Sequence, residues 1–333
     1  MSTELALLLG LALSPGFAKG PAALDVLRMT LDASEAAYEG EIRVATRKGS
    51  QELLVRFSPP ARYRRQLLDE LGTPALTLVS DGRTEWVYDR RRSAVWKGEP
   101  TDPDFKPMDP DEEYGLLTGN YAFALGPEDE VADRDCAVLE VRAKRGSALV
   151  QKLWVDRDYG VVLRRQSFGP DGSLSNEMRF VRVSLPAEDA GWDFSFRPPP
   201  GVKVEESRIR PDPMELWEAA AVSDLEPRTP GWLPPGFVFE SVDLVPYREA
   251  TLLHFRYTDG VDALSLFQCP SGLEVSFLGA GGADARSVRL AHSSARLALQ
   301  ADRKLLEWAS GDRFVLIGSL GLDALRRVAD SVK

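Results

Sequence analysis

The stretch KLWVDRDYGVVLRRQSFGPDGSLSNEMRFVRVSL, from Lys152 to Leu185, decides the fold class. Three apolar runs typical of strands are separated by short connections rich in Gly and Asp. Strands joined by such short turns pair antiparallel, because a parallel connection needs a dozen or more residues. The stretch therefore predicts a meander of three antiparallel strands, and no catalytic group lies inside it.

More strands precede this meander. Apolar residues at helical spacing first predict a helix from about Pro21 to Ala37. Alternating residues then predict a hairpin over Gly40–Phe57, a further strand over Ala61–Gly72 and three short strands over Pro74–Gly98. A short helix is expected at Glu112–Leu117. We expect an α+β fold in which nine or ten strands form a large curved antiparallel sheet, a half-barrel capped by helices, with an apolar cavity at its mouth.

Proline-rich sequence marks a domain boundary after this sheet. We assign residues 19–200 to the first domain and 201–227 to a linker, with a short helix over Met214–Val222. The smaller domain, 228–333, is expected to be mixed α+β. It has several strand patterns, one of them at 273–279, and ends in a helix over Gly321–Lys333.

The first 18 residues have the outline of a secretory signal. An apolar run from Leu5 to Leu13 is followed by small residues near Ala18, and the run is too short to cross a bilayer. Against this interpretation, Glu4 is present and no basic residue precedes Lys19. We expect a periplasmic or otherwise exported protein. The alternative is a cytoplasmic chain whose first helix is apolar.

Composition and charge exclude some classes of partner. The chain is 44% hydrophobic with a formal net charge of -10, which favours a packed core and disfavours nucleic acid as the main partner. No interior stretch is long and apolar enough to span a membrane. The two cysteines, Cys136 and Cys269, leave two alternatives open, one disulfide or two buried thiols.

Catalytic and metal-binding motifs are missing. The sequence has no Gly-x-Ser-x-Gly, His-Glu-x-x-His or Cys-x-x-Cys. Gly279–Ser287 is a Gly-rich stretch that lacks the lysine of a phosphate-binding loop, and Asp109–Glu113 lacks the alternating ligands of a calcium loop. His254 lies in a predicted strand with no second histidine nearby. We therefore expect no enzyme activity, metal or cofactor.

Two groups of residues are candidates for ligand binding. Aromatic side chains on the predicted sheet could line a cavity for acyl chains, although ordinary core packing is the alternative: Phe57, Trp86, Tyr88, Trp96 and Trp154. Trp86 and Tyr88 are two positions apart on one predicted strand and should share a face. Basic residues could hold an anionic headgroup at its mouth, although solvated strands and a hairpin tip are the alternative: Arg62, Arg64, Arg65, Arg90, Arg91 and Arg92.

Three segments resemble one known family. These are LLTGNYAFALGPEDEVADRDCAVLEVRAK, QKLWVDRDYGVVLRRQSFGPDGSLSNEMRFVRV and GWLPPGFVF with LLHFRYTDGVDALSLFQ. Their order and layout resemble the MucB/RseB family of sigma-E regulatory proteins, whose first domain is similar to the lipoprotein carrier (LolA-type) fold. Asp133 stands where the family usually has Gly, and Tyr159 where it usually has Thr.

The resemblance implies a non-enzymatic periplasmic regulator of an envelope-stress sigma factor. Its first domain would bind lipid, lipopolysaccharide or lipoprotein acyl chains, and the protein would bind the periplasmic domain of an anti-sigma factor. Two alternatives remain. One is a periplasmic carrier of lipid or lipoprotein without a signalling partner, and the other is an enzyme with an unrecognised active site.

Overall fold

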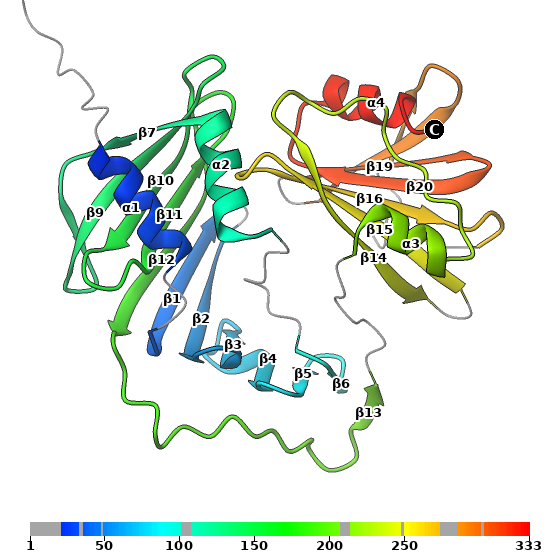
Figure 1. Cartoon of the computed structure of the whole chain (residues 1–333). Coiled ribbons are helices and arrows are strands. Elements are labelled where there is room, and N and C mark those ends of the chain that lie inside the picture. The colour runs from blue at the N-terminus through cyan, green and yellow to red at the C-terminus, as the bar shows by residue number, and fades with distance from the viewer. Residues whose placement is uncertain are drawn as a thin grey trace, which may run out of the picture.

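The computed structural model places two units side by side, each built around one sheet (Figure 1). The residues that the structure describes are 21–32, 36–47, 49–100, 108–206, 214–247, 250–273, 285–300 and 303–333. The expected signal segment, 1–18, lies outside them. None of the helices in these ranges is long and apolar enough to cross a membrane.

The first sheet has thirteen strands and stays open. Its strands are β1 (Tyr38–Thr46), β2 (Gly49–Ser58), β3 (Arg62–Leu68), β4 (Pro74–Asp81), β5 (Glu85–Asp89), β6 (Ala94–Gly98), β7 (Tyr121–Leu125), β8 (Asp129–Val131), β9 (Arg134–Ala143), β10 (Leu149–Asp156), β11 (Val162–Phe168), β12 (Leu174–Ser184) and β13 (Lys203–Glu206). They follow the order β13-β6-β5-β4-β3-β2-β1-β12-β11-β10-β9-β7, with β8 paired to β9. The two end strands, β13 and β7, are not paired with each other in the described ranges.

The predicted fold class is confirmed, with three corrections. The meander from Lys152 to Leu185 forms β10, β11 and β12, all antiparallel. The sheet has more strands than the nine or ten expected, and it is mixed because β13 pairs parallel to β6. Helix α1 (Pro21–Leu31) ends before the expected Ala37, whose carbonyl instead accepts a hydrogen bond from the backbone of Ala187 and extends the β1–β12 ladder.

Helices α1 and α2 (Pro110–Asn120) cover one face of this sheet, which we call the inner face. Ala23 and Leu27 of α1 and Leu117 of α2 pack in one buried cluster with Leu139 and Leu153 of the sheet. Asp109 caps the N-terminus of α2, because its side chain accepts a hydrogen bond from the backbone N–H of Asp111. In Figure 1 the sheet bends after β2, so that β3–β6 lie at the bottom of the view, below α2.

The opposite, outer face of β2–β6 is covered by residues 187–202, which we call the strap. This segment is the green loop at the bottom of Figure 1, and it carries the chain from β12 to β13. Phe196 of the strap lies with its ring centroid 5.8 Å from Trp86 and 6.0 Å from Tyr88. Arg64 donates to the carbonyl oxygens of Asp193 at 3.2 Å and Ser195 at 2.8 Å. The strap thus buries outer-face side chains such as Val79, which is 0% exposed.

The turn after β10 fixes the sheet against α1. Asp156 is buried and accepts hydrogen bonds from the backbone N–H groups of Asp158 and Tyr159 and from Arg134. Gly160 has a φ of +70°, and a Cβ there would lie 2.5 Å from the carbonyl oxygen of Met29. The sharp turn therefore requires glycine.

The second unit is a seven-stranded antiparallel sheet with helices α3 and α4 packed on it. Its strands, in the order β14-β15-β16-β20-β19-β18-β17, are β14 (Val238–Tyr247), β15 (Ala250–Thr258), β16 (Ala263–Cys269), β17 (Arg286–Arg289), β18 (Ser294–Gln300), β19 (Arg303–Ser310) and β20 (Asp312–Gly318). Helix α3 (Leu216–Val222) precedes it, and α4 (Leu322–Asp330) follows it. The β17–β18 hairpin was not predicted, whereas the strand expected at 273–279 and most of the Gly-rich loop expected at 279–287 lie outside the described residues.

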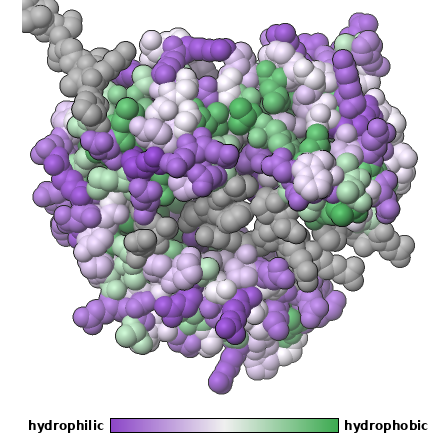
Figure 2. All heavy atoms as spheres, in the orientation of Figure 1, coloured by the Kyte–Doolittle hydropathy of each residue, from purple (hydrophilic) through white to green (hydrophobic). Residues whose placement is uncertain are grey.

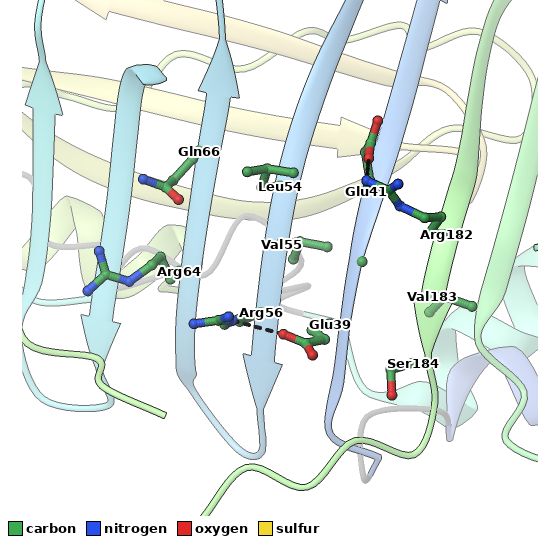
Figure 3. A pocket seen from close by; sticks show the side chains of 11 residues that line it. Glu39, Glu41, Leu54, Val55, Arg56, Arg64, Gln66, Arg182, Val183 and Ser184 are labelled. Atoms are coloured by element: carbon green, nitrogen blue, oxygen red, sulfur yellow. Dashed lines mark hydrogen bonds and ion pairs between the residues drawn. The ribbon is translucent and has the colours of Figure 1, made fainter. Parts of the chain in front are cut away.

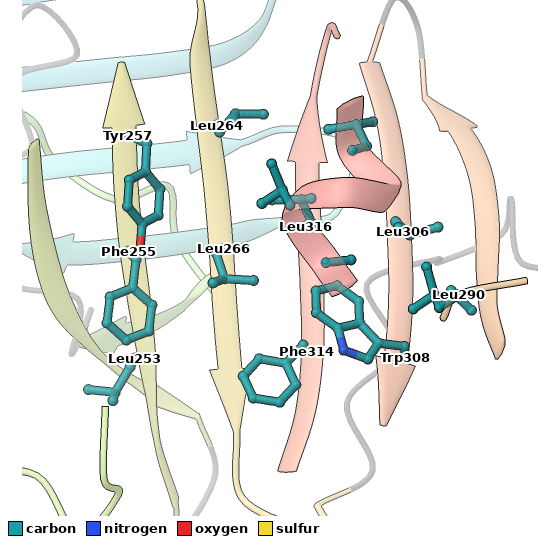
Figure 4. Packing of buried hydrophobic residues seen from close by; sticks show 14 of the residues in the cluster. Leu253, Phe255, Tyr257, Leu264, Leu266, Leu290, Leu306, Trp308, Phe314 and Leu316 are labelled. Atoms are coloured by element: carbon teal, nitrogen blue, oxygen red, sulfur yellow. The ribbon is translucent and has the colours of Figure 1, made fainter. Parts of the chain in front are cut away.

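The core of the second unit lies between the sheet and α4. Leu325 and Val328 of α4 are 0% exposed and pack in one cluster with Phe255, Leu266 and Leu316, shown in close view in Figure 4. Helix α4 thus presents its apolar side to the sheet, as the helical spacing of leucine and valine in the sequence predicts.

The other face of this second sheet buries polar groups. The His254 ring stacks on Phe267, with ring centroids 4.2 Å apart. Asp243 pairs with Arg256 at 2.9 Å and lies 3.7 Å from the His254 Nδ1. Burial, together with the positive charge of Arg256, lowers the pKa of His254 to about 4. Burial outweighs the nearby carboxylate because Asp243 is already paired with Arg256.

Both cysteines are buried free thiols, which settles the alternative left open by the sequence. Cys136 lies in the first sheet and Cys269 in the second. Burial raises the pKa of each thiol to about 11, so both remain protonated at neutral pH.

We expect His254 to make folding stability depend on pH. Because its pKa is about 4 in the folded chain and ~6.5 when unfolded, the unfolded state binds more protons between these values. Stability should fall as pH drops from about 6.5 to about 4, by up to ~1.4 kcal/mol per pH unit, and this contribution should level off below pH 4. Denaturant titrations of wild type and His254→Gln across this range measure it. The exposed His292 offers a control, since His292→Gln should keep the wild-type slope, and an unchanged slope in His254→Gln would contradict the assignment.

Candidate functional site

The inner face of the first sheet carries a band of apolar side chains from neighbouring strands. Directly paired residues on adjacent strands share a face. Leu53 pairs with Leu67, and Leu67 pairs with Leu76. A second row is formed by Val55, Arg65, Leu78, Val87 and Trp96.

This band differs from a closed core because most of its side chains are only half-buried. Along β4 the outer-face residues Ala75, Thr77 and Val79 are buried, whereas the inner-face Leu76 and Leu78 between them are partly exposed. Val87 and Trp96 on the next strands are half-buried as well. The inner face of β2–β6 therefore offers apolar surface that the protein itself has not fully covered.

Polar side chains border this band, and one charged side chain lies within it. Tyr63, which is 0% exposed, donates its hydroxyl hydrogen bond to Glu85, and both side chains are on the inner face. The Arg65 guanidinium lies 4.9 Å from the centroid of the Tyr63 ring. A positive charge thus stands beside the apolar band.

The structure does not bring the five predicted aromatic residues together. Phe57 and Trp96 lie on the inner face, where Phe57 packs on Tyr38 with ring centroids 5.3 Å apart. Trp86 and Tyr88 share a face as predicted, but it is the outer one, against Phe196 of the strap. They cannot share the face of Trp96, because Trp96 pairs with Val87, which points to the opposite side.

Trp154 occupies a third environment. Its indole N–H donates to Asp129 of β8 at 2.7 Å, and the Arg164 guanidinium lies 4.3 Å above its ring. It is 6% exposed and belongs to the buried core near β8. Trp154 is therefore held by side chains of β8 and β11, in a buried cluster that also includes Val55 of β2.

The six predicted arginines also lie apart. Arg65 alone of the six is on the inner face among the apolar band. Arg62 and Arg64 bind the strap, Arg62 through Asp189 at 3.1 Å. At the exposed hairpin tip, Arg90 pairs with Asp69 and Arg92 with Asp89, and Arg91 lies between them.

Sequence reasoning missed the leucines and valine of the inner face. The alternation of apolar residues in the sequence indicates that these side chains share one face of the sheet. The alternation does not indicate which face the strap covers.

A pocket of about 470 Å³ lies on the outer face, beyond the end of the strap (Figure 3). Figure 3 looks at the sheet from its outer side, with strands of the second unit behind it. Charged side chains that line the pocket are paired within the protein: Arg56 binds Glu39 at 3.0 Å, and Arg182 binds Glu41. Its lining residues are Glu39, Gly40, Glu41, Leu54, Val55, Arg56, Arg64, Gln66, Arg182, Val183 and Ser184.

Metal chemistry has no visible basis in the ranges that the structure covers. They contain no group of three or more His, Cys, Asp or Glu residues arranged to hold a metal ion.

The departures from the family pattern fit the observed backbone. Asp133 has a φ of +60°, a left-handed conformation that favours Gly but that Asp tolerates better than most residues. Tyr159 packs under Arg134, whose guanidinium lies 5.5 Å from the ring centroid. Asp133 thus fits the turn between β8 and β9, and Tyr159 the turn between β10 and β11.

Comparison with known proteins agrees with this architecture. The complex of Pseudomonas aeruginosa MucA and MucB is 18% identical, with 94% of this chain and 98% of that chain covered and a TM-score of 0.60. MucB in complex with MucA(peri) is 19% identical, with 93% and 98% covered and a TM-score of 0.58. A structure of MucB is 20% identical, with 94% and 98% covered and a TM-score of 0.57. These similarities show a shared fold.

The sequence of the first unit gives the family. A search of curated proteins finds no match. The family model described as MucB/RseB N-terminal domain matches residues 26–211, which is more than half of the chain. The resemblance seen in the sequence is thereby confirmed, and the chain belongs to the MucB/RseB family.

Proposed function

We propose that this protein is an exported, non-enzymatic regulator that binds an acyl chain on the inner face of its first sheet and an anti-sigma factor through a second surface. The observation that supports acyl-chain binding is the half-buried apolar band of Leu67, Leu76, Leu78, Val87 and Trp96. Burying the remaining exposed surface of these neighbouring apolar side chains under a ligand is favourable.

An acyl chain suits this surface on chemical grounds. Each methylene that leaves water contributes ~0.8 kcal/mol, so four or five methylenes on the band supply affinity without polar contacts. Arg65 is placed to hold the negative end of such a ligand by a charge-assisted hydrogen bond. A lipid with an anionic headgroup therefore fits better than an uncharged one.

The proposal that this protein binds an anti-sigma factor rests on its family membership. Two similar solved structures are described as MucB with MucA and as MucB with MucA(peri). We propose that this chain likewise binds the periplasmic segment of a membrane-anchored anti-sigma factor. Ligand would then act by favouring the form of the protein that holds the partner less tightly.

A charge on the inner face should abolish acyl-chain binding. Leu78→Asp places a carboxylate in the apolar band and should weaken binding of a fluorescent fatty acid at least tenfold. Leu54→Asp is the matched control, since Leu54 is 37% exposed on the outer face, and it should bind within twofold of wild type. Fluorescence titration measures both, with circular dichroism to show that each variant is folded. Equal loss in the two variants would remove the inner face as the site.

The headgroup contribution of Arg65 can be separated from that of the chain. Arg65→Gln should weaken binding of a fatty acid about tenfold and leave the fatty alcohol of the same length unchanged. Arg64→Gln, on the outer face beside the strap, is the neighbouring control and should alter neither ligand. Isothermal titration of both ligands gives the four affinities, and a similar loss for acid and alcohol would argue against a headgroup role.

Binding of a partner distinguishes a regulator from a carrier. The purified chain should capture the periplasmic segment of the anti-sigma factor encoded beside its sigma factor, and the fatty acid should reduce that capture. Biolayer interferometry with the immobilised segment measures both. A carrier without a signalling partner should bind the fatty acid but not the segment.

A further inference from the structure

Three motifs that are distant in the sequence meet at one point between the two units. The first is Asn120-Tyr121, where α2 passes into β7. The second is the turn Pro234–Phe237, in which the backbone N–H of Phe237 donates to the carbonyl of Pro234. The third is the turn Thr258–Asp262 between β15 and β16. Hydrophobic residues gather where the two units adjoin, as Figure 2 shows.

The Asn120 side chain joins both turns of the second unit. Its amide donates to the carbonyl oxygens of Gly236 at 2.9 Å and Asp259 at 3.0 Å. Because both partners are backbone carbonyls, only the amide nitrogen can face them, and the orientation of the side chain is fixed.

Tyr121 adds a bond to a charged group. Its hydroxyl donates to Asp259 Oδ2 at 2.6 Å. The other oxygen of Asp259 accepts from the backbone N–H groups of Val261 at 3.0 Å and Asp262 at 2.8 Å. Burial, together with this carboxylate, raises the pKa of Tyr121, which keeps the hydroxyl a donor. The carboxylate is thus held from both units.

Two glycines permit this close approach. Gly236 has a φ of +98°, and a Cβ there would lie 2.6 Å from Asn120 Oδ1. Gly260 has a φ of +97°, and its Cβ would lie 2.8 Å from a methyl carbon of Leu117. Next to it, Val261 packs into the buried cluster of the first unit that includes Leu117 and Tyr121. The second unit therefore inserts a turn into the packing of α2.

We propose that Asn120, Tyr121 and Asp259 form a latch that holds the two units in one arrangement and connects α2 to the second unit. Helix α2 packs through Leu117 with Leu139 and Leu153, on the part of the inner face that β9 and β10 form, so an acyl ligand that extends from the band to these strands competes with the packing that positions the latch. The first part, the latch, stands on the contacts alone. The second part, release of the latch by an acyl ligand, rests on the proposed function.

The latch is tested without any ligand. Spin labels at Glu128→Cys and Asp323→Cys, whose side chains are 80% and 98% exposed, report the distance between the units by electron double resonance. The native thiols are buried and do not compete for label. We expect one narrow distance distribution in the labelled parent chain. Tyr121→Phe with Asn120→Ala should raise the separated fraction relative to the docked fraction by at least tenfold.

Two further variants make this result specific. Tyr257→Phe removes another buried tyrosine hydroxyl, one within the second unit, and should keep the parent distribution. Gly260→Ala keeps every hydrogen-bonding group of the latch but inserts a methyl group against Leu117, and should also separate the units. An unchanged distribution in the double variant, confirmed as folded by circular dichroism, would overturn the latch.

The coupling is tested by adding the fatty acid to the same labelled chain. The separated fraction should rise in the parent and stay constant when Leu78→Asp is present. If the parent binds fatty acid with no change in distance, the coupling is wrong while the latch stands. If the parent binds no fatty acid, the proposed function and the coupling fall together, and the ligand-free distances still decide the latch.

Discussion

The alternation of side chains along β2–β6 is the constraint on which the rest of the first unit depends. A strand sends successive residues to opposite faces, so each apolar run in this sheet supplies two surfaces that both need cover. The strap provides that cover on the outer face through the aromatic contact of Phe196 and the hydrogen bonds to Arg64. The inner face of the same strands is left with leucine, valine and tryptophan side chains that are only half-buried. The outer face of these strands is thus covered by the protein itself, whereas the apolar side chains of the inner face remain partly exposed.

This division explains which parts of the site could be predicted from the sequence. The strands, the curved sheet and the meander follow from local patterns, because hydrophobic period and turn residues act over a few positions. Trp86 and Tyr88 were correctly placed on one face, but no local signal says that Phe196, more than a hundred residues later, packs on them. Trp96 and Val87, one step out of phase, belong to the other face for the same reason. Which face of a sheet is covered depends on segments that are distant in the sequence and pack across that face.

The roles of the arginine residues were harder to predict from the sequence than the pattern of apolar residues. A run such as Arg90-Arg91-Arg92 suggests an anion site in the sequence, yet its ends are paired with Asp69 and Asp89 at a hairpin tip. Arg64 and Arg65 are neighbours in sequence, but one binds the strap and the other lies beside Tyr63 on the inner face. A guanidinium has five donors and a long flexible stem, so its partner depends on tertiary surroundings that a single sequence does not state. Only the position on the strand, not the residue type, separates these two roles.

The interface between the units explains why two turns of the second unit contain glycine. Gly236 and Gly260 both look like ordinary turn glycines, since proline-glycine and aspartate-glycine pairs occur in turns of all kinds. Their positive φ angles are local facts, but the space that a side chain would need is occupied by Asn120 and Leu117 of the other unit. The same residues that end α2 therefore dictate glycine at two turns more than a hundred residues away. Because α2 also lies on the inner face, the packing that closes the sheet and the packing that joins the units share one helix. A change in the packing of α2 on the sheet therefore alters the packing between the units, unless α2 rotates as a rigid body about its C-terminal end. Asn120 opposes such a rotation, because it is bound to two carbonyls of the second unit at that end.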